Sequence, residues 1–171
     1  MNKKRIKYAI KLMKKAKNLK MGEYQRGKDY ARTLHDLHEM GNKASFGGYI
    51  ALSPMFQEVG GYSGYEGYPI LNDRVGWWAV AEFFQVHRDL YPIIVAINYG
   101  DFECRDVGEP LSKKDHLNLS KRECKALEQL NKLCDNTKCK RWKKRHLVNM
   151  LKALRDGEFD WLIDYKEEEE Q

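Results

Sequence analysis

Apolar side chains near the start of the chain recur at helical spacing. They lie three or four residues apart, and lysines fill most positions between them; the stripe consists of Ile6, Ala9, Ile10, Met13 and Ala16 and ends at Lys20 or Met21. Positions at this spacing share one face of an α-helix, so the segment predicts a basic amphipathic helix. We expect it to dock on a core with its lysines in solvent. A face that binds a polyanion, or a membrane surface, is the alternative.

A shorter stripe predicts a second helix and carries a pair of histidines. Its apolar positions are Tyr30, Leu34, Leu37 and Met40. His35 and His38 lie three residues apart, a spacing that metal sites use. Two histidines without a nearby acid or cysteine are a weak ligand set, so we expect surface or core-edge histidines and no metal.

Glycine and tyrosine are concentrated between residues 40 and 72. Gly41 suits a helix C-terminus, and Gly47 and Gly48 allow close packing of the backbone. Ser53 followed by Pro54 is typical of a helix start. We expect a short helix over residues 54–59, ended by glycines 60 and 61, and a loop over residues 62–72.

The glycines of this loop resemble a phosphate-binding pattern only in their spacing. Gly61, Gly64 and Gly67 are three residues apart, but no buried strand precedes them and no Gly-Lys-Ser/Thr follows. Both features are needed to cradle a nucleotide phosphate. We therefore expect the loop tyrosines to pack locally or to contact a partner; they are Tyr62, Tyr65 and Tyr68.

The most apolar part of the chain runs from Asp73 to Phe102. Trp77, Val80, Ala81 and Phe84 repeat at helical intervals and predict a helix ending near His87. The following segment, LYPIIVAINY, fits either a strand, because it is rich in isoleucine, or a helix with proline in its first turn.

Two further helices are predicted in the last third of the chain. Ser120 and Glu123 form a capping box for the first, and the second runs from Thr137 to a stop at Gly157. A short turn between them makes a helical hairpin. The predicted fold is therefore mainly α: a compact helical domain over residues 1–157 with a Gly/Tyr-rich central loop, followed by an acidic segment, 158–171, that frays.

Charge is segregated along the chain. The net charge is +6, but the first 20 residues hold nine Lys and Arg and no acid, whereas residues 156–171 hold eight acids and one lysine. Such ends can attract each other, or leave the basic end free for a polyanion. The length of 171 residues suits one domain.

Basic residues are also concentrated in the segment KCKRWKKRH, residues 138–146. Six Lys and Arg fall in the first two turns of the predicted helix, where the macrodipole is already positive, so each costs a few tenths of a kcal/mol. A phosphate-rich partner, or the acidic segment of the chain, would offset this cost. We expect Trp142 to anchor the core, with base stacking as the alternative.

No group of residues in the sequence suggests catalysis. The four cysteines, Cys104, Cys124, Cys134 and Cys139, form no C-x-x-C pair and resemble small core residues. No secretory signal or long apolar run is visible, which favours a reduced, cytoplasmic protein. We expect no enzyme activity and no cofactor.

The segments AKNLKMGEYQ, MGNKASFGGYIALSPMFQEVGG, GYPILN and GWWAVAEFFQVH together resemble a loose family of small, mostly uncharacterised phage and mobile-element proteins. In that family a Cys-Gly-Thr-x-x-Cys-x-x-Gly-aromatic segment precedes a Gly-Pro loop and a helix. Met40 and Ser45 stand in place of the family's cysteines, so a thiol or metal role does not carry over, while Gly41, Gly48 and Tyr49 are kept. The resemblance implies a mainly helical fold, a helix for LYPIIVAINY, and a phage origin.

These observations lead to a functional hypothesis. We expect a non-enzymatic phage-type interaction protein, a counter-defence or host-takeover inhibitor that acts on a host nucleic-acid-handling complex in the cytoplasm of the host cell. The alternatives are a direct DNA- or RNA-binding module and a nucleotide-binding sponge. The expected contact residues are Lys3, Lys4, Arg5, Lys11, Lys14, Lys15, Lys138, Lys140, Arg141, Lys143, Lys144 and Arg145, with the three loop tyrosines as further candidates.

Overall fold

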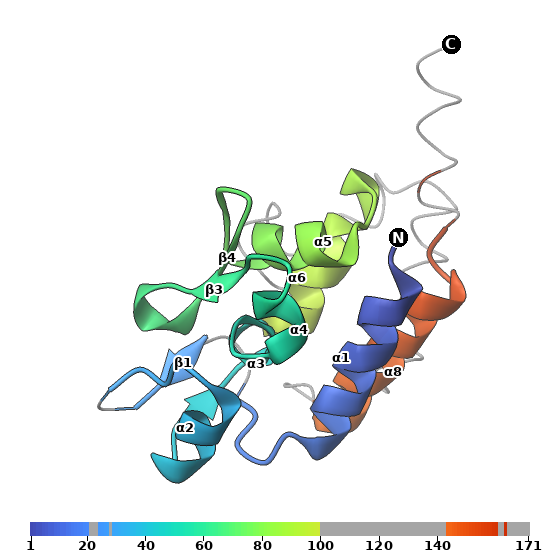
Figure 1. The fold of residues 1–171 in the computed structure, drawn as a ribbon. Helices are drawn as coiled ribbons and strands as arrows, with labels where there is room; N and C mark the ends of the chain where they lie inside the picture. Colours follow the sequence, from blue (N-terminus) through green and yellow to red (C-terminus); the bar gives the residue numbers. More distant parts are fainter. Residues whose placement is uncertain (21–23, 28, 100–142, 161–162, 164–171) are drawn as a thin grey trace, which may run out of the picture.

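The computed structural model of the 171-residue chain describes residues 1–20, 24–27, 29–99, 143–160 and 163 (Figure 1). The helix predicted from Ser120, the hairpin that it would form, Trp142 and all four cysteines lie outside the described residues.

The first predicted helix is confirmed as α1 (Lys3–Lys15). Asn2 caps it, because its side-chain oxygen accepts a hydrogen bond from the Arg5 backbone N–H at 3.1 Å. The apolar stripe of the helix is buried, including Ile6 and Met13, and the chain leaves the helical path at Ala16. α1 therefore ends earlier than the lysine-rich pattern suggests.

The second predicted helix lies in the connection between the two strands of a small sheet. Strands β1 (Gln25–Arg26) and β2 (Lys43–Ala44) pair antiparallel, and α2 (Leu34–Glu39) lies between them in sequence. The Gln25 side chain holds the intervening loop, since its amide oxygen accepts from the Ala31 N–H at 2.8 Å and its amide nitrogen donates to the Ala31 carbonyl at 2.9 Å. The strands of this sheet were not predicted.

The segment expected to be a loop contains a second sheet. Helices α3 (Phe46–Ala51) and α4 (Pro54–Gln57) are followed by β3 (Tyr62–Ser63), a 3₁₀ turn (Tyr65–Gly67), β4 (Pro69–Leu71) and β5 (Arg74–Val75), which pair in the order β3-β4-β5. Asn72 and Asp73 join β4 to β5, and both have positive φ, 49° and 60°. Such two-residue turns match the twist of paired strands. The prediction of a loop over residues 62–72 is therefore wrong.

The apolar part of the chain forms two helices. α5 (Trp77–Phe84) begins after Gly76 and ends with Gln85 in the left-handed region. A 3₁₀ turn (Arg88–Leu90) leads into α6 (Tyr91–Tyr99), so LYPIIVAINY is a helix, as the resemblance implied. Isoleucines 93, 94 and 97 are buried on it.

The last described helix is α8 (Lys144–Asp156), and Gly157 ends it with a φ of 79°, as predicted. Lys143 is its N-cap with extended backbone. Within the described residues, only Lys144 and Arg145 of the predicted basic cluster therefore lie in its first turn.

The fold class predicted from the sequence is wrong. Helices account for 56% of the described residues, and five strands form two antiparallel sheets, so the fold is mixed α/β rather than mainly α. The physical reason is that each strand is only two or three residues long. The alternation of buried and exposed positions that marks a strand is then too short to be recognised in the sequence.

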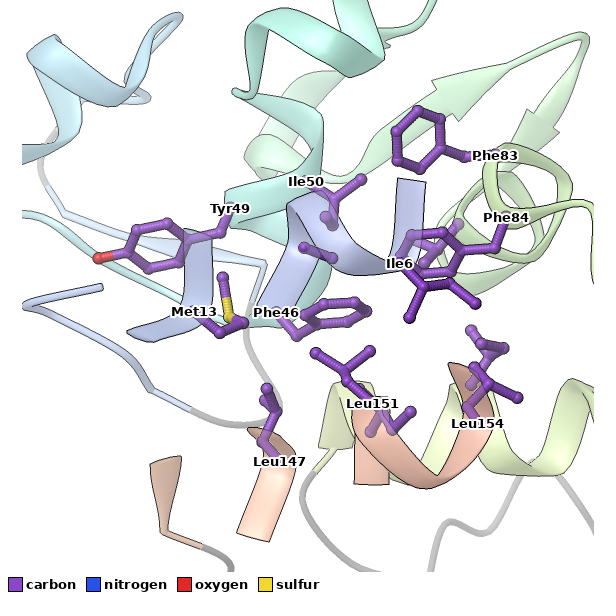
Figure 2. Packing of buried hydrophobic residues seen from close by; sticks show 14 of the residues in the cluster. Ile6, Met13, Phe46, Tyr49, Ile50, Phe83, Phe84, Leu147, Leu151 and Leu154 are labelled. Atoms are coloured by element: carbon purple, nitrogen blue, oxygen red, sulfur yellow. The ribbon is translucent and has the colours of Figure 1, made fainter. Parts of the chain in front are cut away.

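The hydrophobic core lies between the helices (Figure 2). Ile6 and Met13 of α1, Phe46 of α3, Phe84 of α5 and Leu151 of α8 converge there, and all are fully buried. Phe46 stacks on Phe84 at 6.0 Å between ring centroids. This core fixes α1 and α8 beside each other at one side of the molecule (Figure 1). The lysines of both helices are exposed.

Candidate functional site

Helices α1 and α8 lie side by side and antiparallel (Figure 1). The Lys144 ammonium group, at the start of α8, donates hydrogen bonds to the carbonyls of Lys14 (3.3 Å) and Ala16 (2.9 Å), at the end of α1. At the opposite ends, the pKa of Asp156 is lowered, chiefly by its hydrogen bond with Arg155 and to a smaller extent by the charges of Lys3 and Lys152. The basic residues of α1 and the described part of the second basic segment, residues 143–146, therefore lie on adjoining elements of one surface.

The charge of this surface is uneven along the helix pair. Neither α1 nor α8 contains an acidic residue before Asp156, which is paired with Arg155 at 2.7 Å. The end where α1 finishes and α8 begins thus carries only positive formal charges on these two helices. We call this region the basic end; its exposed side chains are Lys14, Lys15, Lys17, Lys143, Lys144 and Arg145.

A stripe of lysines extends from the basic end along α1. Its exposed members are Lys3, Lys4, Lys7 and Lys11. Residues three and four apart on a helix are neighbours, so like charges at these positions repel one another by a few tenths of a kcal/mol per pair. A polyanion bound along α1 would relieve this repulsion.

Three of the expected contact residues have structural partners: Arg145 Nε lies 3.1 Å from Nε2 of the neighbouring His146, and Arg5 and Lys144 bind other helices. The Arg5 guanidinium donates to the Phe83 carbonyl at 2.7 Å and lies 5.0 Å from the centroid of the Phe83 ring. Lys144 caps the C-terminus of α1, where a cation is favoured by the helix dipole. Both residues join helices. The expected contacts Lys138, Lys140 and Arg141 lie outside the described residues.

His146 stabilises the start of α8 without being exposed. Its ring is 2% exposed, and Nδ1 accepts a hydrogen bond from the Lys143 backbone N–H at 3.1 Å. This bond satisfies a backbone group at the helix N-terminus. This capping role was not predicted from the sequence.

The loop tyrosines divide into exposed and packed side chains. Tyr65 is 73% exposed and Tyr62 56% exposed, whereas Tyr68 is half-buried with its ring edge against Tyr24. Tyr65 meets Tyr30 edge-on at 5.4 Å. Desolvation raises the pKa of Tyr30, and the charge of Glu66 adds to this shift.

The space beside the glycines of the same segment is filled by neighbouring side chains. A Cβ on Gly61 would collide with the Phe56 ring, one on Gly64 with Tyr68, and one on Gly67 with Gln25. Gly67 also has a φ of 78°. A pocket of about 530 Å³ is lined by Arg26, Gly27, Asp29, Met40, Gly41, Asn42 and Lys43, so none of these three glycines contributes to it.

An aromatic cluster at the start of α5 was missed at the sequence level. Trp78 is 42% exposed, Trp77 stacks on it at 4.1 Å, and Tyr91 meets it edge-on at 4.9 Å. The Arg74 guanidinium lies 6.0 Å from the Trp78 ring centroid. The Trp-Trp pair gave no signal by itself, because consecutive residues of a helix point only about 100° apart and both can be buried, as Phe83 and Phe84 of the same helix are.

The described residues contain no cluster of three metal-ligating side chains. His35 and His38 are both exposed, and His35 lies 3.9 Å from Glu39, as expected of surface histidines. Another imidazole–carboxylate pair is formed by His87 and Asp89, at 3.3 Å between Nδ1 and Oδ2. Among the described helices, none is long and apolar enough to cross a membrane.

No protein-family model, curated protein or solved structure matches this chain. The resemblance to phage and mobile-element proteins stays a prediction.

Proposed function

We propose that this chain is a non-enzymatic interaction protein that engages a nucleic-acid-handling complex by binding the phosphates of its nucleic acid with helices α1 and α8. The observation that carries the proposal is the antiparallel pairing of these helices. It places Lys14 and Lys15 at the same end as Lys143. When clustered lysines neutralise the phosphates of a nucleic acid, the counterions condensed on that nucleic acid are released. This release is the main driving force for binding without sequence preference.

The wider biological role in this proposal is that of a phage-type counter-defence or host-takeover inhibitor in the host cytoplasm. The resemblance of residues 6–99 to phage proteins supports it. The basic surface is compatible with an inhibitor that occupies the nucleic acid of a host complex, and positive charge argues against mimicry of DNA by the described helices. Co-purification from host cells, with and without nuclease, tests whether the nucleic acid mediates the interaction.

Direct binding is tested by fluorescence anisotropy with DNA and RNA over a range of salt concentrations. Lys11→Gln/Lys15→Gln removes two exposed cations from α1 and also relieves repulsion within the helix, so folding is preserved. Each lost phosphate contact should reduce the slope of log K against log salt by about 0.9 for duplex DNA and about 0.7 for single strands. The variant therefore binds more weakly, with a shallower slope.

The matched control removes two exposed cations elsewhere. Arg32→Gln/Lys43→Gln lowers the net charge by the same amount but leaves α1 and α8 intact. We expect its affinity and salt slope to stay close to those of the wild-type protein. Equal losses in both variants would show that net charge alone drives binding, and absence of salt-sensitive binding would exclude the proposed contact.

A further inference from the structure

The Trp78 ring belongs to a layered stack at the surface of the molecule. Trp77 lies against it with an interplanar angle of 25°, Tyr91 packs edge-on at 85°, and the Arg74 guanidinium lies over the ring. Exposed tryptophan is rare on surfaces that contact only water, because the ring leaves a large apolar area in solvent. Here the other aromatic rings hold Trp78 in one orientation.

Arg74 keeps its charge available in this stack. No carboxylate pairs with it in the described part of the chain. A guanidinium lying over an aromatic face retains N–H donors at its edge and offers a planar surface of its own. The group can therefore stack on a flat ligand and donate hydrogen bonds to a phosphate.

The beginning of α5 adds a second positive feature beside the ring. Gly76 is the N-cap and has no side chain to accept from the first N–H groups, and the first turn contains no acidic residue. The unpaired N–H groups of a helix N-terminus favour an anion. The flat aromatic surface, the Arg74 cation and this helix start therefore lie together.

We propose that Arg74 and Trp78, backed by Trp77 and Tyr91, bind an unpaired nucleobase of single-stranded nucleic acid. The base stacks either on the outer face of the Arg74 guanidinium or, with Arg74 displaced, directly on the Trp78 indole. The adjoining phosphate is attracted by the guanidinium and by the start of α5. This inference rests on the proposed function and specifies its ligand, since bases in a duplex are stacked on one another and cannot reach the ring.

The position of the stack relative to the lysine stripe supports a continuous path. The other end of α5 contacts the start of α1, where the Asn2 N–H donates to the Phe84 carbonyl at 2.7 Å. An eight-residue helix spans about 12 Å. The separation between Trp78 and the first lysines of α1 is therefore within the reach of a few nucleotides.

The experiment compares a short single-stranded oligonucleotide with its duplex at one salt concentration, by fluorescence anisotropy. Trp78→Leu removes the aromatic face while keeping apolar volume. We expect it to weaken single-strand binding about tenfold, the effect of losing one stacked base, and to leave duplex binding unchanged. Trp78→Phe, which keeps an aromatic face, should retain most single-strand affinity and shows that the loss is not caused by misfolding.

The matched control is Tyr30→Leu, because Tyr30 is also an exposed aromatic residue, 39% against 42% for Trp78, but packs on Tyr65 outside the Trp78 stack. It should alter neither affinity. The inference is overturned if Trp78→Leu leaves single-strand binding unchanged, or weakens both ligands equally. In either case, salt-sensitive binding that depends on Lys11 and Lys15 would still support the proposed function. Absence of binding to both ligands would overturn both proposals.

Discussion

The Lys144 ammonium group donates a hydrogen bond to the Ala16 carbonyl at 2.9 Å, across the junction of α8 and α1. A basic residue that resembles a nucleic-acid contact in the sequence thus holds two helices together. Simultaneous charge reversal of the whole basic segment would therefore disturb folding as well as binding.

This bond predicts different effects for two neighbouring lysines. Lys144→Ala should lower the free energy of unfolding by about 1 kcal/mol, because a hydrogen bond to a helix-terminal carbonyl is lost. Lys143→Ala, whose side chain is exposed, should change it by less than about 0.5 kcal/mol. Urea denaturation of both variants provides the measurement. If both variants were equally stable, the Lys144 hydrogen bond would not stabilise the fold, and Lys144 would again be a candidate contact residue.

A second prediction concerns the buried Asn98 of α6. Its side-chain oxygen accepts from the Ser45 hydroxyl at 3.1 Å and from the Gly47 N–H at 2.9 Å, tying α6 to the start of α3. Asn98→Ala leaves two buried donors unpaired and should cost about 3 kcal/mol. The half-buried Asn149 provides the control, since Asn149→Ala should change stability by less than about 0.5 kcal/mol. Similar melting temperatures for the two variants would show that water replaces the lost bonds.

The third prediction contrasts two glycines. A Cβ on Gly48 would collide with the backbone oxygen of Tyr24, whereas nothing lies within 4 Å of a Cβ on Gly60. Gly48→Ala should therefore destabilise the protein by about 3 kcal/mol through overpacking. Gly60→Ala should cost only about 1 kcal/mol, for its left-handed backbone. Thermal denaturation distinguishes them, and a mild effect at Gly48 would mean that the segment containing Tyr24 shifts freely.

Long amphipathic helices could be predicted from the sequence, and short strands could not. The stripe of α1 repeats over several turns, so its buried face was identified correctly, and the C-terminal end of α8 at Gly157 was predicted from the glycine. Strands such as β4, with three residues, have no measurable period. Their pairing depends on the turn at Asn72 and Asp73, whose left-handed backbone is a property of the folded hairpin rather than of residue type alone.

The candidate site was predicted in its parts but not in its arrangement. Both basic segments were recognised from charge, yet their meeting at Ala16 and Lys144 depends on how α1 and α8 dock on Phe46 and its neighbours. The Trp78 stack could not be predicted because Trp77 fits the apolar stripe of α5, and helical spacing does not show whether the adjacent ring is buried or exposed. Sequence spacing describes one helix at a time, whereas each of these sites joins several elements.

The last prediction concerns Asp36 in the capping box of α2. Its carboxylate accepts from the Thr33 backbone N–H at 3.0 Å, and its own N–H donates to the Thr33 hydroxyl at 3.1 Å. The side-chain hydrogen bond with Thr33 is the largest cause that holds the pKa of Asp36 below 3.8; bonds from the Arg32 and Thr33 backbones add to it. Because the folded pKa lies below the unfolded one, the stabilisation is present above pH 3.8 and is lost as the pH falls through the folded pKa.

An NMR titration of the Asp36 carboxyl carbon measures this shift directly. Thr33→Val removes the hydroxyl at nearly constant volume, so the pKa should rise toward 3.8 and α2 should become less ordered. Thr33→Ser keeps the hydroxyl and should retain the lowered pKa. If the valine and serine variants titrate alike, the Thr33 hydroxyl is not the group that stabilises the carboxylate, and the backbone N–H of Arg32 and residue 33 must account for the shift.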